Sequence, residues 1–464
     1  MFTVLWLFPL DPSSLLRLSP LLSFPIILDH NATTRPAPEV VDAMHQMLAE
    51  LWHNPSSIHR PGQSARQKMD LARQDIARLL GVRPRHITLT GSGTEALDLA
   101  IRGHLLARGL VGRASAGKPP ATIITSPTEH IGVRDLARAL EREEGVRVLW
   151  AELDAGGRVS VESIAKFLDE HHAPAGGGGE GREVALVSVQ WANNEVGTIQ
   201  PVWEIGKLCR DRGVTFHCDA TQWVGKMPTR VNGEGTGGSR DHGNAAIGGM
   251  SENDDEPAAD WASTPLDVDL LTCSPHKFHG PKGVGVLYAR PGVRTATLIH
   301  GEQELGRRGG TENIAGIIGA GAACKLAAEW LADQDNRVRG GELRDHFERS
   351  LLASVPNARI NGSHESERDR LWNTSSIGFP RLEAEALLML LSERGIACSA
   401  GAACSSGSLE ASPVLKAMRI DPLYAHGTLR FSISRETTRD EIVRAVPIIS
   451  DCVARLRQSM SGLE

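Results

Sequence analysis

Lys277 is the residue of this chain with the clearest chemical potential, because it closely follows the apolar, strand-like run of residues 268–273. A lysine amine can form a Schiff base with the carbonyl group of a cofactor, and desolvation by a sheet favours its neutral, nucleophilic form. The neighbouring Ser274 and His276 supply hydrogen-bond donors for a phosphate. A lysine after a strand is more often a solvated surface charge, so the rest of the sequence must decide whether Lys277 carries a phosphorylated carbonyl cofactor.

Other polar residues follow the preceding apolar runs in a regular order. They are Gly93 and Thr94 after the first run, His130 after the second, Asn194 after the fourth, and Asp219 and Gln222 at the end of the fifth. In open α/β sheets, ligands bind at the carboxyl ends of the strands. We thus expect one edge of the sheet to carry hydrogen-bond donors for a phosphate, an imidazole, an amide, a carboxylate and an amine. This set of groups matches what pyridoxal phosphate requires.

The elements that must position these residues alternate along the chain. Seven β-rich runs are predicted at residues 86–90, 121–126, 146–153, 184–190, 214–219, 268–273 and 283–289. Helices are predicted between them, at residues 64–80, 161–172 and 202–212, and the first of these ends on Gly81 as a helix C-terminal glycine. The alternation predicts an α/β fold with a mainly parallel seven-stranded sheet and helices on both faces.

Beyond about residue 329 the pattern changes to long helical stretches with a few strands, at residues 373–379 and 428–434. We therefore expect a large cofactor-binding domain over residues 26–330 and a smaller α+β domain over residues 331–464. Residues 1–25 are expected to be a loose extension or a misassigned start, with a membrane-surface anchor as the alternative. Two glycine-rich or polar inserts, residues 173–181 and 232–265, are expected to be surface loops.

Composition narrows the classes of function. The chain has 464 residues, 41% of them hydrophobic, and a formal net charge of -6 without a basic stripe, which favours a globular protein that does not bind nucleic acid. Its seven cysteines include no Cys-x-x-Cys pair, so no disulfide scaffold or metal site is expected, and a reducing cytoplasm is. Asp11 and several prolines interrupt the apolar start, which also lacks a basic region, so neither a membrane span nor a signal peptide is predicted. The incomplete Gly-x-Gly-x-x-Gly pattern disfavours a dehydrogenase.

Taken together, seven motifs resemble those of the cysteine desulfurases of the class V aminotransferase group. These are pyridoxal-phosphate enzymes of fold type I that take sulfur from L-cysteine and leave alanine. The resemblance covers nearly all of residues 28–456. The motifs are Leu28-Asp29-His30-Asn31-Ala32-Thr33-Thr34, Asn54-Pro55-Ser56-Ser57, Asn193-Asn194-Glu195, Asp219-Ala220-Thr221-Gln222, the Lys277 segment, Arg307-Arg308-Gly309-Gly310-Thr311-Glu312-Asn313, and Ala403-Cys404-Ser405-Ser406-Gly407-Ser408-Leu409-Glu410.

The resemblance implies a role for each cofactor-facing residue. Lys277 would be the Schiff-base lysine and a proton carrier, and Asp219 would pair with the pyridinium nitrogen. Gln222 and Asn194 would bind the ring hydroxyl oxygen, while His130 would stack on the ring and relay protons. Phosphate binding would fall to Gly93, Thr94, Ser274 and His276.

The same resemblance assigns the substrate-facing residues. Arg430 would bind the substrate carboxylate, a task suited to a planar bidentate donor. Cys404 would be the nucleophile that becomes a persulfide and passes sulfur to an acceptor protein, such as an iron–sulfur scaffold. Thr311 would reach the phosphate of a second subunit, which implies a homodimer. Cys398 has no such role and is expected to be structural.

Some residues depart from the family pattern, and other functions stay open. Residues 300–305 replace a glycine-rich stretch with bulkier groups, and Pro275 stands where glycine is usual. Selenocysteine lyase and class V aminotransferase use the same cofactor-binding groups, although an aminotransferase has no need of Cys404. A non-catalytic sulfur-relay or scaffold subunit is the alternative outside enzymes.

Overall fold

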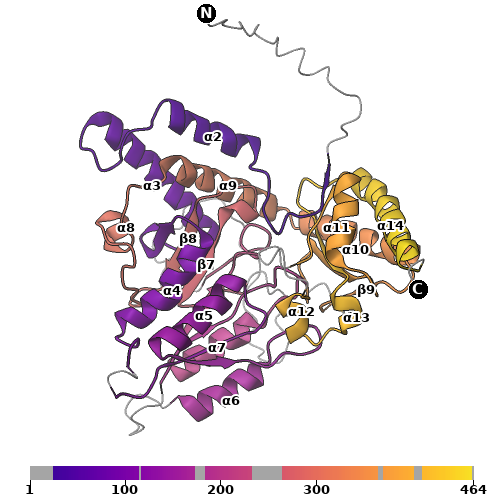
Figure 1. The fold of residues 1–464 in the computed structure, drawn as a ribbon. Helices are drawn as coiled ribbons and strands as arrows, with labels where there is room; N and C mark the ends of the chain where they lie inside the picture. Colours follow the sequence, from indigo (N-terminus) through magenta and orange to yellow (C-terminus); the bar gives the residue numbers. More distant parts are fainter. Residues whose placement is uncertain are drawn as a thin grey trace, which may run out of the picture.

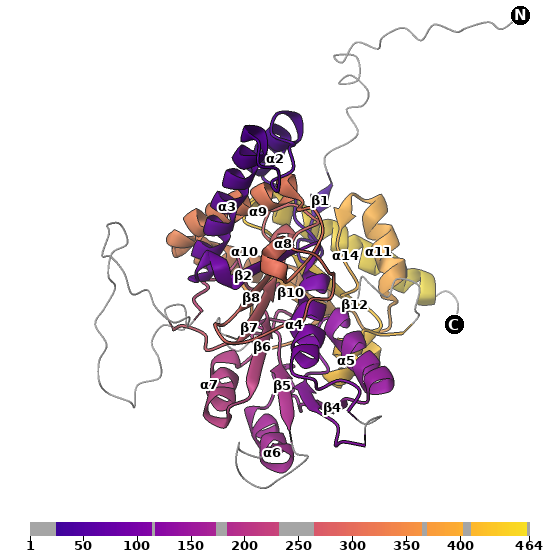
Figure 2. The ribbon, with the colours of Figure 1, turned by 90° about the vertical axis from the view of Figure 1, so that its left-hand side faces the viewer.

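The computed structural model describes residues 25–113, 117–172, 183–231, 264–363, 369–401 and 410–461 (Figures 1 and 2). The expected extension at residues 1–24, the insert 173–181, most of the insert 232–265, and Cys404 lie outside the described residues. The predicted strands all form. They are β2 (Ile87–Thr90), β3 (Thr122–Thr125), β4 (Arg147–Trp150), β5 (Val184–Ser188), β6 (Thr215–Asp219), β7 (Leu270–Cys273) and β8 (Gly285–Ala289).

These strands make one sheet in the order β2-β8-β7-β6-β5-β3-β4. Strand β8 runs antiparallel to β2 and β7, and the other neighbours are parallel. The prediction of a mainly parallel seven-stranded sheet is therefore confirmed. Its central strands are rich in buried side chains because helices cover both faces of the sheet.

The helices around the sheet are α2 (Pro38–Ala49), α3 (Arg60–Leu80), α4 (Gly93–Ala107), α5 (Ile131–Glu144), α6 (Val161–His171), α7 (Val202–Arg212), α8 (Gln303–Gly306) and α9 (Ile314–Ala332). Helices α4 and α5 cover one face, where Leu270 and Leu287 point. Helices α3, α6, α7 and α9 cover the other face, where Leu271 and Val286 point. As predicted, α3 ends at Gly81, whose φ of 70° is left-handed.

Helix α9 is, within the described part of the chain, the one helix with the length and hydropathy of a membrane span. However, 56% of its apolar window is buried. It packs against α2 and α3 on the face of the sheet, so its hydrophobic composition serves the core (Figure 1).

The C-terminal elements form a separate layer beside the sheet (Figure 1). Strands β12 (Thr428–Ser432), β10 (Thr374–Gly378) and β9 (Arg359–Ile360) make an antiparallel sheet in that order. The accompanying helices are α10 (Asp335–Ser354), α11 (Ala384–Glu393), α12 (Pro413–Ala417), α13 (Pro422–Ala425) and α14 (Arg439–Ser461). Strand β1 (Ile26–Ile27) pairs with β11 (Ile396–Ala397), so the start of the described chain joins these C-terminal elements.

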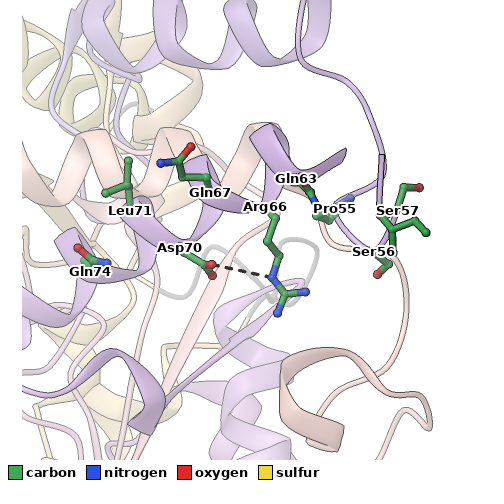
Figure 3. A pocket seen from close by; sticks show the side chains of 10 residues that line it. Pro55, Ser56, Ser57, Gln63, Arg66, Gln67, Asp70, Leu71 and Gln74 are labelled. Atoms are coloured by element: carbon green, nitrogen blue, oxygen red, sulfur yellow. Dashed lines mark ion pairs between the residues drawn. The ribbon is translucent and has the colours of Figure 1, made fainter. Parts of the chain in front are cut away.

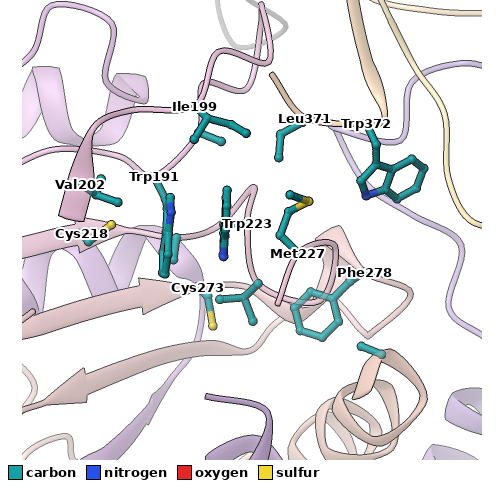
Figure 4. Packing of buried hydrophobic residues seen from close by; sticks show 14 of the residues in the cluster. Trp191, Ile199, Val202, Cys218, Trp223, Met227, Cys273, Phe278, Leu371 and Trp372 are labelled. Carbon is teal, nitrogen blue, oxygen red and sulfur yellow. The ribbon is translucent and has the colours of Figure 1, made fainter. Parts of the chain in front are cut away.

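A tryptophan cluster underlies the segments that follow β5 and β6 (Figure 4). The rings of Trp191 and Trp223 stack with centroids 4.5 Å apart and 5° between their planes, and Trp203 meets both edge-on. Trp191 and Trp223 are buried. Because aromatic rings pack rigidly and bury large areas, this cluster holds the two segments in fixed positions relative to each other.

Candidate active site

A cavity of ≈ 440 Å³ lies between the carboxyl ends of the parallel strands and the C-terminal elements. Among the residues that line it are Gly93, Thr94, His130, Asn194, Asp219, Gln222, Ser274, His276, Lys277 and Arg430. Thr311 does not line it, and Cys404 lies outside the described residues. Except for these two, the fold brings the predicted site residues together, although they come from segments spread along the chain between β2 and β12.

One end of the cavity is built to receive an anion. Helix α4 begins directly after β2, and its N-cap Ser92 accepts a hydrogen bond from the Glu95 amide at 3.1 Å. The first-turn amides of Gly93 and Thr94 have no partner within the helix and carry its positive dipole end. A Cβ at Gly93 would lie 3.1 Å from Cβ of Ser274, so glycine allows the close approach of these segments. This corner suits a phosphate.

His130 and Asp219 face the middle of the cavity from α5 and β6. The Nδ1 atom of His130, the N-cap of α5, accepts the Gly132 amide at 3.1 Å. Burial lowers the pKa of His130, with a further contribution from Lys277, while Asp219 opposes the shift. The ring is therefore neutral and carries its proton on Nε2. Asp219 ends β6 and accepts the Thr221 amide at 3.0 Å, which orients its carboxylate.

Lys277 ends a short 3-10 turn, η3 (Pro275–Lys277), after β7. Its Nζ donates to the carbonyl oxygens of Asn31 and Ala32, both at 2.8 Å. The segment around Asn31 is held there by Thr34, whose amide and hydroxyl both donate to the His276 carbonyl at 2.9 Å. The Leu28 to Thr34 motif therefore forms the wall against which the lysine lies, a placement that no local sequence pattern indicates.

Arg430 projects from β12 into the opposite wall. Its Nη2 pairs with Asp29 at 2.7 Å, its Nη1 donates to the Asn194 carbonyl at 3.0 Å, and its side chain is buried. Its Nε has no hydrogen-bond partner among the described residues. A guanidinium held on one side by a carboxylate and a carbonyl retains donors for a bidentate anion.

Both ends of the segment that carries Cys404 reach this cavity, since Gly401 and Pro413 line it. The buried carboxyl of Glu195 contacts both ends. Its Oε2 accepts the Ser412 hydroxyl at 2.5 Å, and a Cβ at Gly401 would lie 2.7 Å from the same oxygen. Burial raises the pKa of Glu195.

Several cavity residues were not selected as site residues in the sequence analysis, although they stand beside selected ones. Glu129 precedes His130; its Oε1 accepts the Gln190 amide at 2.8 Å, and its Oε2 is buried without a partner among the described residues. Burial raises the pKa of Glu129 well above its usual range, with a further contribution from the nearby Asp219. The position of Glu129 directly after the predicted strand at residues 121–126 could have identified it as a cavity residue.

The fold and this site define the class of protein. The family model for aminotransferase class-V matches residues 26–236 and 261–444. The chain therefore belongs to the aminotransferase class-V family, a family of pyridoxal-phosphate enzymes. Within that family it groups with the cysteine desulfurases, since it is 39% identical to the cysteine desulfurase of Cereibacter sphaeroides over 93% of this chain and 96% of that one.

Solved structures agree with this grouping. A structure described as a NifS-like protein matches with a TM-score of 0.75 and 31% identity, over 93% of this chain and 100% of that chain. A second structure, described as SspA in complex with cysteine, matches with a TM-score of 0.67 and 26% identity, over 89% of this chain and 99% of that chain. The fold-type I architecture is thus confirmed.

The residues present fit pyridoxal phosphate. The α4 N-terminus gives the cavity an anion-binding corner, and Lys277, Asp219 and His130 lie around the remaining space. The cofactor needs an amine for covalent attachment, a carboxylate for its ring nitrogen and donors for its phosphate. Within the described residues, no group of three or more His, Cys, Asp or Glu side chains could hold a metal ion.

Proposed function

We propose that this protein is a cysteine desulfurase that converts L-cysteine to L-alanine and holds the released sulfur as a persulfide on Cys404. The observation that carries the proposal is the meeting of Lys277, Asp219, His130 and Arg430 in one cavity. The flanks of the Cys404 segment also line that cavity. A carboxylate-binding arginine and a thiol at one cofactor site suit an amino acid that bears sulfur.

Pyridoxal phosphate, when bound, supplies an electron sink that stabilises negative charge on the substrate carbon. Lys277 would attach it, Asp219 would bind its ring nitrogen, and Gln222 and Asn194 would bind its ring oxygen. His130 would cover the ring, and Gly93, Thr94, Ser274 and His276 would bind the phosphate. These roles are supported by the position of each residue in the cavity lining and by the family to which the chain belongs.

The side chains of the protein bind the substrate and move its protons. Arg430 binds the substrate carboxylate, and its ion pair with Asp29 keeps the guanidinium oriented. Lys277 holds the proton removed from Cα and returns a proton to the product. The neutral His130 ring donates from Nε2 and accepts again, because its lowered pKa leaves it uncharged at neutral pH.

Sulfur transfer balances without an external oxidant. The Cys404 thiolate attacks the substrate sulfur, an S–S bond forms, and the substrate Cβ–S bond breaks with its electron pair left on carbon. A proton on that carbon then completes alanine. Thiolate formation requires a proton acceptor near Cys404, because a free thiol is mostly protonated at neutral pH.

The first experiment is a product assay. The purified protein is incubated with pyridoxal phosphate, L-cysteine and a thiol reductant, and alanine and sulfide are quantified together. We expect equal amounts of both, over many turnovers. A reaction without L-cysteine is the control. If a cofactor-loaded protein forms neither product, the proposal is wrong, and selenocysteine and transamination substrates become the ones to assay.

We further propose a homodimer in which Thr311 contributes to the site of the second subunit. Thr311 is exposed, lies outside its own cavity and belongs to the segment between α8 and α9. An ion pair of Arg73 with Glu304 at 2.5 Å joins α8 to α3. An open hollow of ≈ 510 Å³ lies on the same helix α3 (Figure 3). Ile58 lines this hollow and is 92% exposed, and Trp52, six residues earlier in the chain, is 68% exposed. Large exposed apolar groups on one flank are typical of an interface.

Light scattering after size-exclusion chromatography tests the dimer. The wild-type protein is expected at twice the chain mass, and Ile58→Asp is expected to shift it toward the monomer with loss of cofactor affinity, because the Thr311 contact is lost. A wild-type monomer with full activity would exclude a shared site. Met389→Asp, a 70% exposed residue on α11, is the matched control.

We also propose an acceptor protein for the sulfur and a cytoplasmic compartment. The persulfide is passed to an acceptor protein, such as an iron–sulfur scaffold. The described cysteines are all free thiols, which suits a reducing cytoplasm.

A further inference from the structure

Lys226 is a buried amine close to the site, and the proposed mechanism gives it no role. It lies in the segment that follows β6 and is 5% exposed. Its Nζ donates to Oε1 of Gln222 at 2.6 Å and to Oδ1 of Asn31 at 2.9 Å. The described residues provide it with no carboxylate ion pair. A buried lysine without a counter-ion is costly, and burial lowers the pKa of Lys226 well below its usual range.

Asn31 links this amine to Lys277. Lys277 donates to the Asn31 backbone carbonyl at 2.8 Å, and Lys226 donates to the Asn31 side-chain carbonyl. The Asn31 amide is oriented by donation to Thr374 at 2.8 Å, and Asn373 donates to the same Asn31 oxygen at 3.0 Å. The two lysines are therefore bound to one fixed residue.

Gln222 is oriented in the same way. With its Oε1 bound to Lys226, its Nε2 points to the other side and donates to the Asn31 carbonyl at 3.1 Å. Gln222 lines the ≈ 440 Å³ cavity, whereas Lys226 is absent from that lining. Lys226 thus binds the Gln222 carboxamide from outside the cavity, while Gln222 itself lines the cavity.

A second, small cavity of ≈ 20 Å³ adjoins the site, and Lys277 lines both. Lys226, His30 and Asn373 are among its other lining residues. This space suffices for about one water molecule. The Nδ1 atom of His30 is buried there without a partner among the described residues. Gly225, with a φ of 78°, permits this arrangement, because a Cβ at that position would lie 2.3 Å from the Phe278 ring.

We propose that Lys226 is a positioning residue of the reaction: it holds the Gln222 carboxamide so that its N–H, rather than its carbonyl, faces the ring oxygen of the cofactor. Without Lys226, the Gln222 carboxamide can turn its carbonyl oxygen toward the anionic ring oxygen, and the two oxygens repel each other. The inference rests on the proposed role of Gln222. It adds a residue that touches neither cofactor nor substrate.

The groups around Lys226 do not obscure a change in the titration of the bound cofactor. The titratable and charged groups around it are Lys277, Arg430, Arg435 and the imidazoles of His30, His276 and His279. Burial lowers the pKa of each of these histidines to about 4. A titration seen near or above neutral pH therefore does not arise from them.

The test is the pH titration of the visible absorbance of the bound cofactor in Lys226→Met, Gln222→Leu and the double variant. Loss of the oriented hydrogen-bond donor to the ring oxygen favours protonation of the bound cofactor, so we expect the midpoint in Lys226→Met to rise by about one pH unit. Cofactor affinity should fall about tenfold. Because both residues act through one hydrogen bond, the double variant should shift no further than Gln222→Leu alone.

Lys166→Met, an exposed lysine on α6, is the control. Lys226→Ala, which likewise removes the donor, serves if the methionine variant does not fold. A wild-type titration in the Lys226 variant, or shifts that add in the double variant, would overturn the inference while the product assay stands. A wild-type protein that binds no cofactor would overturn the proposed function instead.

Discussion

Lys277→Ala is expected to lose both the visible absorbance of the covalently bound cofactor and the formation of alanine. The expected loss of rate is about four orders of magnitude or more, as for the removal of a covalent catalytic group. The physical reason is that Nζ of Lys277 is the amine held at the cavity wall by two backbone carbonyls at 2.8 Å. The absorbance spectrum and the alanine assay measure the two effects independently.

The control for this variant is Lys166→Ala, which removes an exposed amine far from the cavity. It should leave spectrum and rate unchanged. If Lys277→Ala keeps its colour and its rate, the cofactor is attached elsewhere, and Lys226 and Lys282 are the nearby amines to replace next.

Cys404→Ala is expected to separate cofactor chemistry from sulfur transfer. The variant should keep the absorbance of the bound cofactor, because the cofactor-binding groups in the cavity lining are unchanged. It should form no persulfide, and sulfide release should fall to about 1% of the wild-type rate or less, since the nucleophile is missing. Intact-protein mass spectrometry after incubation with L-cysteine, without reductant, detects the added sulfur atom.

Cys398→Ala is the matched control, since Cys398 is the described cysteine nearest in sequence. Burial raises the pKa of the Cys398 thiol, which keeps it protonated and unreactive. This variant should retain desulfuration. Full desulfuration by Cys404→Ala, together with loss of activity in Cys398→Ala, would show that the nucleophile was assigned to the wrong cysteine.

The sheet was predictable from the chain because its signals are local. Each strand is a run of four or five residues rich in apolar and β-branched side chains, and most of these side chains are buried. The order of polar residues after these runs then predicted Asp219, His130 and Lys277 at one edge. A parallel α/β sheet brings those ends together whatever the lengths of the intervening helices.

The small C-terminal layer was predicted less fully. The runs at residues 373–379 and 428–434 became β10 and β12, but the pairing of β1 with β11 joins residues about 370 positions apart in sequence. A two-residue strand has no periodicity to detect. The motif that begins at Leu28 therefore matched a family pattern without indicating that it would line the site.

By itself, the sequence determined the class of fold, the edge at which the site lies and the residue types that perform the chemistry. Only the tertiary structure decided which side chains hold those residues in place. Lys226 meets Asn31 across 195 positions, and Glu195 meets Ser412 across 217. Such contacts depend on how separate elements pack, and a buried polar group takes the partner that packing brings within hydrogen-bond distance, whatever its place in the chain.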